Sequence, residues 1–354
     1  MGNVYRVGLN LGTLCNLKCK YCYEHDHQPT SVPTEYLDRY AEYLLYLVST
    51  LPEGSKLDVG IYGGEPLLHI DRIERFIRQT QSCVRKYIIV INGTLVDSCK
   101  EQLLRLAQYN KMRSTVAIRV SYDFTLQDSM RCAGTYDTVR DAIRWLHNQG
   151  LCTGVTPVFT FATIHHFKEV FLDFVELRKE LPRLRMLFNI DKNAEKVPDD
   201  FNEQELREQL AFVRDYLAAN PELEGSIEYN KAVWNKRWEP ADTGAFYRNL
   251  IGAMVDDGTM YPAWSVPYYH EEAKKLLRFG HITDDFDTLI ANRYALIAKL
   301  PKMSVPSTCT DCALNCRLNP FQAITENLDQ WNTKPRFEGT CYLTKLINEY
   351  LPID

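Results

Sequence analysis

The chain has 354 residues, of which 45% are hydrophobic and 25% are charged, and its formal net charge is −5. This composition is typical of a globular protein with one or two domains. The acidic charge without basic blocks argues against a nucleic-acid partner. No apolar run reaches the roughly 18–20 residues that span a bilayer, which argues against a membrane partner. The first residues, MGNVYR, are no export signal, so we expect a soluble cytoplasmic protein.

Short apolar runs alternate with amphipathic stretches over the first 220 residues, a pattern that favours alternating strands and helices. The predicted strands are 4–11, 57–62, 87–91, 115–121, 152–161 and 184–190. The predicted helices are 34–47, 70–83, 98–108, 136–148, 166–179 and 203–218, with Thr34 as the N-cap of the first.

Six strand–helix units in a row predict an α/β fold with a parallel sheet. We expect a partial (β/α)6 TIM barrel, with sites at the carboxyl ends of its strands. A doubly wound sheet is the alternative, because strand order cannot be read from one sequence. The pattern weakens near residue 230, so we predict one domain over 1–232 and a second over 233–354.

Three cysteines lie directly after the first predicted strand, at Cys15, Cys19 and Cys22, with the spacing C-x3-C-x2-C. Three thiolates without a close fourth indicate a metal site with one open coordination position, and thiolates are the usual iron–sulfur ligands. Zinc completed by His25 or His27 is the alternative on spacing alone, because structural zinc takes four ligands. Disulfides are not expected without a secretory signal.

The segment CNLKCKYCY at 15–23 resembles the signature of the radical S-adenosylmethionine (SAM) superfamily. In that family the three cysteines hold a [4Fe–4S] cluster whose fourth iron binds SAM. An electron from the cluster releases a 5′-deoxyadenosyl radical, which no side chain can supply. The resemblance implies an oxidoreductase or maturase that binds SAM and a [4Fe–4S] cluster. It also implies an external electron donor such as flavodoxin or ferredoxin.

Segments at the ends of the next strands resemble the SAM-binding motifs of the family. They are GGEP at 63–66, NGT at 92–94 and a segment at 121–134 similar to S-x-D-G…H-D-x-x-R-x-x-G. Phe124 and Gln127 replace the usual Gly and His of the last motif. Taken singly, these segments also fit ordinary turns, loop packing and a surface arginine. The resemblance implies SAM contacts by Tyr21, Gly63, Gly64, Glu65, Pro66, Asn92, Ser121 and Arg131.

Four further cysteines form a second group, at Cys309, Cys312, Cys316 and Cys341. Four thiolates suffice for a closed site with zinc or an iron–sulfur cluster. DGTMYP at 257–262 and FGHI at 279–282 resemble the auxiliary-cluster region called SPASM, or its shorter form, twitch. This implies a C-terminal auxiliary [4Fe–4S] cluster, with zinc as the alternative metal. Ala263 and Pro320 stand where cysteines are usual, so we expect one auxiliary cluster instead of two.

The substrate class follows from the resemblance alone. Relatives with SPASM regions mostly modify peptides or proteins, as the anaerobic sulfatase-maturating enzymes do. We therefore expect the radical to abstract hydrogen from a peptide or protein, in a maturase reaction or in the modification of a ribosomally made peptide. A dehydrogenase or rearrangement enzyme for a small metabolite is the alternative, and a zinc-stabilised scaffold without catalysis is a remote one. The cysteine motif begins near residue 1, so we expect no leader-binding domain before it.

The sequence assigns no catalytic base or hydrogen donor. The aromatic-rich segment 229–270 is expected to line a peptide groove or to pack in the core. Candidates by chemistry alone are Asp256, Asp257, His281, Cys83, Cys99, Cys132 and Cys152.

Overall fold

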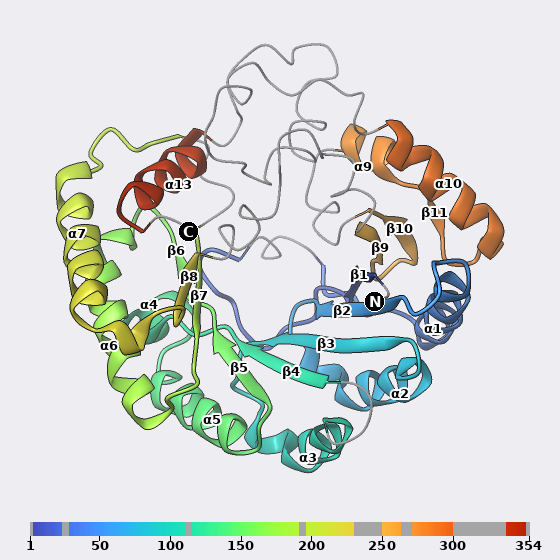
Figure 1. Ribbon diagram of the computed structural model, residues 1–354, viewed down its shortest axis with the longest axis horizontal. Helices are drawn as coiled ribbons and strands as arrows, with labels where there is room; N and C mark the ends of the chain where they lie inside the picture. The colour runs from blue at the N-terminus through green and yellow to red at the C-terminus, as the bar shows by residue number, and fades with distance from the viewer. Residues whose placement is uncertain are drawn as a thin grey trace.

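The computed structural model describes residues 3–22, 28–110, 115–190, 196–229, 250–262, 271–299 and 338–351. These residues form one curved sheet of eleven strands, whose outer face is covered by helices (Figure 1). The strand order is β11-β10-β9-β1-β2-β3-β4-β5-β7-β6, with β8 beside β7. Within the described ranges the two ends of the sheet do not pair, so the fold is the predicted partial barrel.

Six strands run parallel in chain order, each followed by a helix on the outer face. The strands are β1 (Val4–Asn10), β2 (Lys56–Tyr62), β3 (Val84–Ile91), β4 (Thr115–Val120), β5 (Cys152–Val155) and β7 (Met186–Ile190). The helices are α1 (Thr34–Ser49), α2 (Ile70–Thr80), α3 (Lys100–Tyr109), α5 (Tyr136–Asn148), α6 (Phe167–Glu180) and α7 (Glu203–Ala219). Short helices lie at η1 (Pro66–His69), η2 (Asp97–Cys99), η3 (Phe124–Leu126), α4 (Gln127–Met130), η4 (Ile164–His166) and η5 (Pro221–Leu223).

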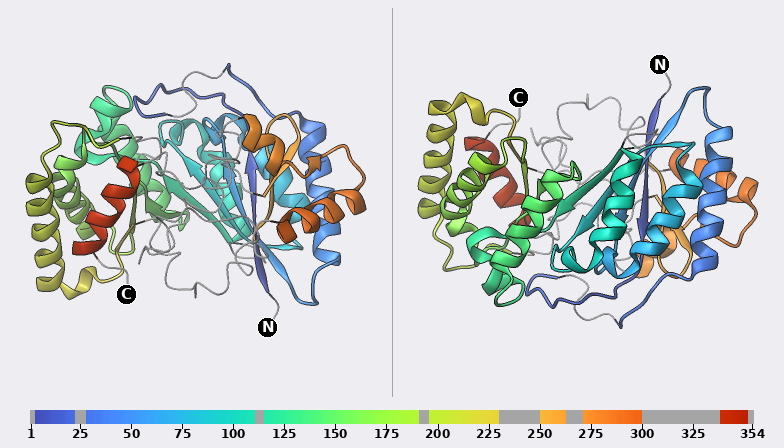
Figure 2. Two further views of the ribbon diagram at one scale, coloured as in Figure 1. Left: turned by 90° about the horizontal axis from the view of Figure 1, so that it is seen from above. Right: turned by 90° about the horizontal axis from the view of Figure 1, so that it is seen from below.

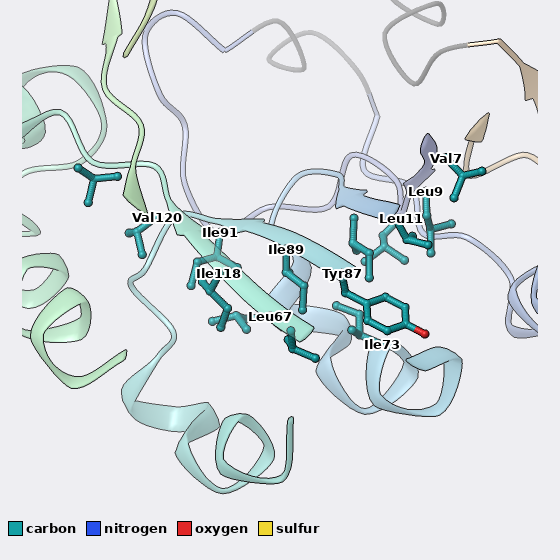
Figure 3. Close-up of a cluster of buried hydrophobic side chains, with 14 of the residues drawn as sticks. Val7, Leu9, Leu11, Leu67, Ile73, Tyr87, Ile89, Ile91, Ile118 and Val120 are labelled. Atoms are coloured by element: carbon teal, nitrogen blue, oxygen red, sulfur yellow. The ribbon is translucent and has the colours of Figure 1, made fainter. Parts of the chain in front are cut away.

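The main core lies between the sheet and these helices (Figure 3). Alternate residues of each strand point to the helices, and those of β3 and β4 include Tyr87, Ile89, Ile118 and Val120, all fully buried. Burying a large apolar side chain contributes about 1.5–3 kcal/mol. The intervening residues therefore face the inside of the barrel.

Several predicted element ends differ from the observed ones by up to three residues, as at the end of α2 and the start of β3, and two differences have a clear cause. The N-cap of α1 is Pro33 and makes no side-chain cap, so Thr34 is the first helical residue. Proline can start this helix because its ring already holds φ at −60°, close to the helical value. The predicted fifth strand, 152–161, divides into β5 and β6 (Val158–Phe159). Pro157 lies at the break, where it has no N–H to continue the ladder.

The described part of the C-terminal region extends the barrel sheet, which the sequence analysis did not predict. β9 (Leu250–Met254) pairs parallel with β1, and β10 (Thr259–Tyr261) and β11 (Gly280–His281) continue antiparallel. The helices α9 (Glu271–Leu277) and α10 (Phe286–Lys299) lie on this side (Figure 1).

At the opposite end of the sheet, β8 (Ile227–Tyr229) pairs with β7. The helix α13 (Glu338–Tyr350) lies beside α7, as both views of Figure 2 show, and Arg207 Nη1 lies 2.7 Å from Glu349 Oε2. The predicted boundary at 232 and 233 lies outside the described residues and stays a prediction. Among the described helices, none has the length and apolar character needed to cross a membrane.

Candidate functional site

The three cysteines lie on one loop that leaves the carboxyl end of β1. The backbone N–H of Cys22 donates to the carbonyl of Cys19 at 3.0 Å, and that of Lys20 donates to Met130 at 2.9 Å. Burial raises the pKa of Cys15 and raises that of Cys19 to about 11, and each thiol also interacts electrostatically with Cys22. The three sulfur atoms therefore share one partly desolvated environment.

The GGEP segment after β2 lies directly against the cysteine loop. The N–H groups of Gly64 and Glu65 donate to the carbonyls of Gly12 and Leu14, at 2.8 and 2.9 Å. A Cβ atom on Gly64 would lie 2.3 Å from Leu14 O, and one on Gly63 would lie 2.9 Å from Gly12 O. The two glycines thus allow a backbone contact between the motifs, which the sequence analysis did not predict. Their contact with SAM stays a prediction.

Glu65 connects the ends of β2 and β3. Its side chain is buried, and its two carboxylate oxygens accept from the backbone N–H groups of Leu67 at 2.8 Å and Asn92 at 2.6 Å. Burial raises the pKa of Glu65 to about 7, although both N–H groups lower it. Pro66 follows as the buried first residue of η1. Glu65 is therefore a positioning residue, and the predicted SAM contacts of Glu65 and Pro66 remain untested.

The NGT segment after β3 binds the cysteine loop through a ring of side-chain hydrogen bonds. Asn92 Nδ2 donates to Asn16 Oδ1 at 2.8 Å, and Asn16 Nδ2 donates to Thr94 Oγ1 at 2.8 Å. Thr94 N closes the ring by donating to Asn92 Oδ1 at 2.9 Å. Asn92 Nδ2 also lies 4.0 Å from Cys15 Sγ. The sequence analysis predicted no role for Asn16 or Thr94. Their positions inside the cysteine motif and the NGT motif were the only signal for these contacts.

A buried ion pair after β4 contacts the middle cysteine. Arg131 Nε donates to Asp123 Oδ2 at 2.8 Å, and Arg131 Nη1 lies 3.9 Å from Cys19 Sγ. The Tyr21 hydroxyl donates to Asp123, and the Arg131 guanidinium lies 5.3 Å from the centre of the Tyr21 ring. Asp123 Oδ1 also accepts from Val158 N at 2.9 Å. Asp123 thus joins β4, β6 and the loop, a role signalled only by its place in the S-x-D motif.

The charge of Arg131 acts on the thiol beside it. Burial by itself lowers the pKa of Arg131, but Asp123 and the neighbouring phenol and thiol raise it above its ordinary value. The guanidinium in turn opposes the effect of burial on the pKa of Cys19. The predicted contacts of Arg131 and Tyr21 with SAM stay predictions.

Phe124 and Gln127, which replace the usual Gly and His of the family motif, both pack or hydrogen-bond within the site. Phe124 has φ +54°, in the left-handed region that favours the usual glycine, and its ring packs 4.7 Å from that of Tyr122. Gln127 is buried and accepts from Asp123 N at 3.0 Å through Oε1. Ser121 precedes them at the end of β4, where its N–H donates to Ile91 O at 2.7 Å, so it lies beside the end of β3.

The candidates in the C-terminal region have structural contacts. His281 Nε2 lies 2.7 Å from Asp257 O, and Asp257 Oδ1 accepts from Thr259 N at 2.8 Å. Both side chains therefore stabilise the turn between β9 and β10. Cys341 is half-buried on α13. The other three ligands of the predicted auxiliary site, Cys309, Cys312 and Cys316, lie outside the described residues, as do His25 and His27.

The remaining free thiols differ in exposure. Cys83 and Cys99 are buried, Cys152 is half-buried and Cys132 is exposed. In the described ranges, no three His, Cys, Asp or Glu side chains are arranged to hold a single metal ion. Thiolates are the usual ligands of iron–sulfur clusters, so three thiols on one loop fit a [4Fe–4S] cluster by their chemistry.

One family model matches the N-terminal part of the chain. Residues 9–174 match the family model of the radical SAM superfamily, a segment that contains the three cysteines and all three SAM-type motifs. No curated protein matches the chain.

Two solved structures of low sequence identity share the fold. The structure of anSMEcpe with bound AdoMet and the Cp18Cys peptide has a TM-score of 0.68 and 18% identity, covering 98% of this chain and 96% of that one. SuiB of Streptococcus suis bound to the precursor peptide SuiA has a TM-score of 0.62 and 14% identity, covering 88% and 70%. At these identities the likeness shows the fold alone. The family match over residues 9–174, the partial barrel and the motifs at its strand ends together support the assignment of this domain to the radical SAM superfamily.

Proposed function

We propose that this protein reductively cleaves SAM and abstracts hydrogen from a peptide or protein substrate. Cys15, Cys19 and Cys22 are the proposed ligands of a [4Fe–4S] cluster. When bound, the cluster supplies the electron that splits the sulfonium of SAM into methionine and the 5′-deoxyadenosyl radical. The electron comes from an external donor such as flavodoxin or ferredoxin.

One observation carries this proposal: the ends of three further strands are bonded to the cysteine loop. The contacts come from Gly64 after β2, Asn92 after β3 and the Asp123–Arg131 pair after β4. Each of these contacts fixes a backbone or side-chain group of the cysteine loop close to one of the thiols. A loop held from several rigid elements keeps its ligands in a fixed geometry, which metal-cluster binding requires.

The positive charge near Cys19 suits thiolate ligation. Metal ligation needs a deprotonated sulfur, and burial opposes deprotonation by raising the pKa of the thiol. The Arg131 guanidinium favours the thiolate because it lowers the pKa of Cys19 against the effect of burial. Asp123 keeps that guanidinium in place.

The proposed SAM contacts surround the same loop. Asn92 and Ser121 end adjacent strands, and Tyr21 and Arg131 lie beside Cys19. The resemblance adds the GGEP segment at 63–66, in which Gly64 and Glu65 donate to the loop backbone. The solved structure of anSMEcpe holds bound AdoMet, which supports SAM as the ligand of this fold.

The choice of substrate class follows the two solved structures. That of anSMEcpe contains the Cp18Cys peptide and that of SuiB contains the precursor peptide SuiA. A peptide or protein is therefore our first candidate, and a small metabolite is the second. The proposed auxiliary [4Fe–4S] cluster would be held by Cys341 with the cysteines at 309, 312 and 316.

The test is anaerobic reconstitution of the wild type, Cys19→Ala and the control Cys132→Ala, which changes an exposed thiol outside the loop. We expect Cys19→Ala to lose about four irons per chain and to form no 5′-deoxyadenosine with dithionite. The control should keep both. Wild-type yields of 5′-deoxyadenosine from Cys19→Ala would refute the mechanism. Mass spectrometry of incubated peptides and metabolites then separates the two substrate classes.

A further inference from the structure

Arg119 lies on the inner face of the barrel. It follows Ile118 and precedes Val120 on β4, and both neighbours are fully buried on the helix side of the sheet (Figure 3). Successive side chains of a strand point to opposite faces, so Arg119 points to the inside. Its partners in the sheet are Val90 on β3 and Gly154 on β5. Arg119 therefore lies on a central strand of the parallel sheet, with a neighbouring strand on each side.

This position lies directly below the proposed SAM contacts. Ser121 follows Arg119 by two residues on the same face, and Asn92 follows Val90 in the same way on β3. Two residues of a strand advance the chain by about 7 Å. Arg119 therefore lies about 7 Å further into the barrel than Asn92 and Ser121, which follow the ends of β3 and β4.

Arg119 has no carboxylate partner within the part of the chain that the structure describes. Among the described residues, its guanidinium forms no hydrogen bond or ion pair; burial lowers its pKa, and the phenol of Tyr62 on β2 opposes that effect. Lys86 on β3 lies within electrostatic range: burial lowers its pKa, and so does the charge of Arg119. Asp58 interacts with Lys86, but its carboxylate is occupied by Arg85, with contacts of 3.0 Å to Nε and 2.5 Å to Nη2.

Among the described residues, the carboxylate that acts on this pair, Asp58, is already held by Arg85. Partly desolvated charges are costly in a folded protein unless they are paired. Arg119 and Lys86 are placed on the face that a substrate must reach to meet a radical formed at the strand ends. A guanidinium binds a carboxylate through two parallel N–H···O bonds, and a lysine adds a second charge.

We propose that Arg119, assisted by Lys86, is a specificity-determining subsite that binds a carboxylate of the substrate inside the barrel. This inference rests on the proposed function and adds a chemical class to it. For a peptide, the carboxylate is an Asp or Glu side chain or the chain's C-terminus. For a small metabolite, it is an acid group near the carbon that loses hydrogen.

The test is phenylglyoxal labelling of arginines in the anaerobically reconstituted protein with SAM bound, mapped by peptide mass spectrometry. The probes are glutarate, the neutral glutaramide and inorganic phosphate. We expect glutarate to slow the labelling of Arg119 about tenfold at ten times its half-protecting concentration, because labelling follows the unbound fraction. Glutaramide should have no effect. Arg75, an exposed arginine paired with Asp38 on the outer surface, is the internal control.

Lys86→Gln should raise the half-protecting glutarate concentration about fivefold, since one charge is lost. Lys100→Gln, a change of an exposed lysine on α3, should not. Arg119 that is never labelled, or that glutaramide protects as well as glutarate does, would overturn the subsite. Protection by SAM alone would assign Arg119 to the cofactor, and protection by phosphate but not glutarate would replace the carboxylate with a phosphate.

Labelling needs no radical, so its outcome is independent of the reaction. Missing protection counts against the subsite, whereas a reconstituted wild type that does not cleave SAM counts against the proposed function. Once peptides are available, Glu-containing and Gln-containing versions distinguish a side-chain carboxylate from a C-terminal one.

Discussion

The Asp123–Arg131 pair should be among the most sensitive sites in the protein, because both partners are buried. Their side chains are 1% and 6% exposed, and Arg131 Nε lies 2.8 Å from Asp123 Oδ2. Asp123→Asn or Arg131→Met leaves the other group without its partner in a desolvated position. Removing one member of a buried pair costs about 3–5 kcal/mol, mainly because the remaining charge stays buried.

The double variant should cost little more than either single one, since no stranded charge remains. We therefore expect a coupling energy of about 3 kcal/mol from the double-mutant cycle. The matched control is the exposed pair of Asp38 and Arg75, also in contact at 2.6 Å, for which the coupling should stay below about 1 kcal/mol. The assay is urea unfolding followed by circular dichroism, with midpoints converted by a common slope.

A second measurement links the pair to the cysteine loop. Arg131 lowers the pKa of Cys19, so Arg131→Met should raise that pKa further and slow alkylation of this thiol by iodoacetamide at pH 9. A coupling energy below about 1 kcal/mol would show that the pair is effectively solvated. That result, or unchanged alkylation of Cys19, would refute the reasoning.

Three further predictions concern the rest of the site. Gly64→Ala places a Cβ 2.3 Å from Leu14 O and should displace the cysteine loop and lower the iron content. Gly150→Ala strains the backbone at φ +71° but meets no atom within 4 Å and lies outside the loop, so it should leave the iron content unchanged. The pKa of Glu65 is raised from 4.5 to about 7, so the stability it contributes is complete below pH 4.5 and is lost as the pH rises through 7. Between pH 6 and 8.5 the wild type should thus lose about 1.4 kcal/mol relative to Glu65→Gln in urea unfolding, and a constant difference would contradict this. Cys341→Ala should reduce iron from about eight to about four per chain if the auxiliary site holds a cluster, and zinc analysis of the wild type tests the alternative.

The parallel part of the fold was predictable because its signals are local. All six predicted strand–helix units are present, although the fifth strand is split at Pro157 and α1 begins after Pro33. Apolar alternation and helical spacing depend on the nearest residues alone, so one sequence suffices to read them. Which strands neighbour one another depends on distant contacts, and β9 pairing with β1 had no local signal.

The chemistry of the candidate site could be predicted from the spacing of Cys15, Cys19 and Cys22 and from the motifs at the next strand ends. Each of these motifs is a short continuous segment, so the sequence alone is enough to find it. Only the tertiary structure decided what these motifs do to one another. Glu65 proved to join two strands, and Asp123 to hold Arg131 against Cys19. It also decided that Arg119 faces the inside of the barrel without a carboxylate among the described residues. Residues far apart in the chain make these contacts, and their distance and burial come only from folding.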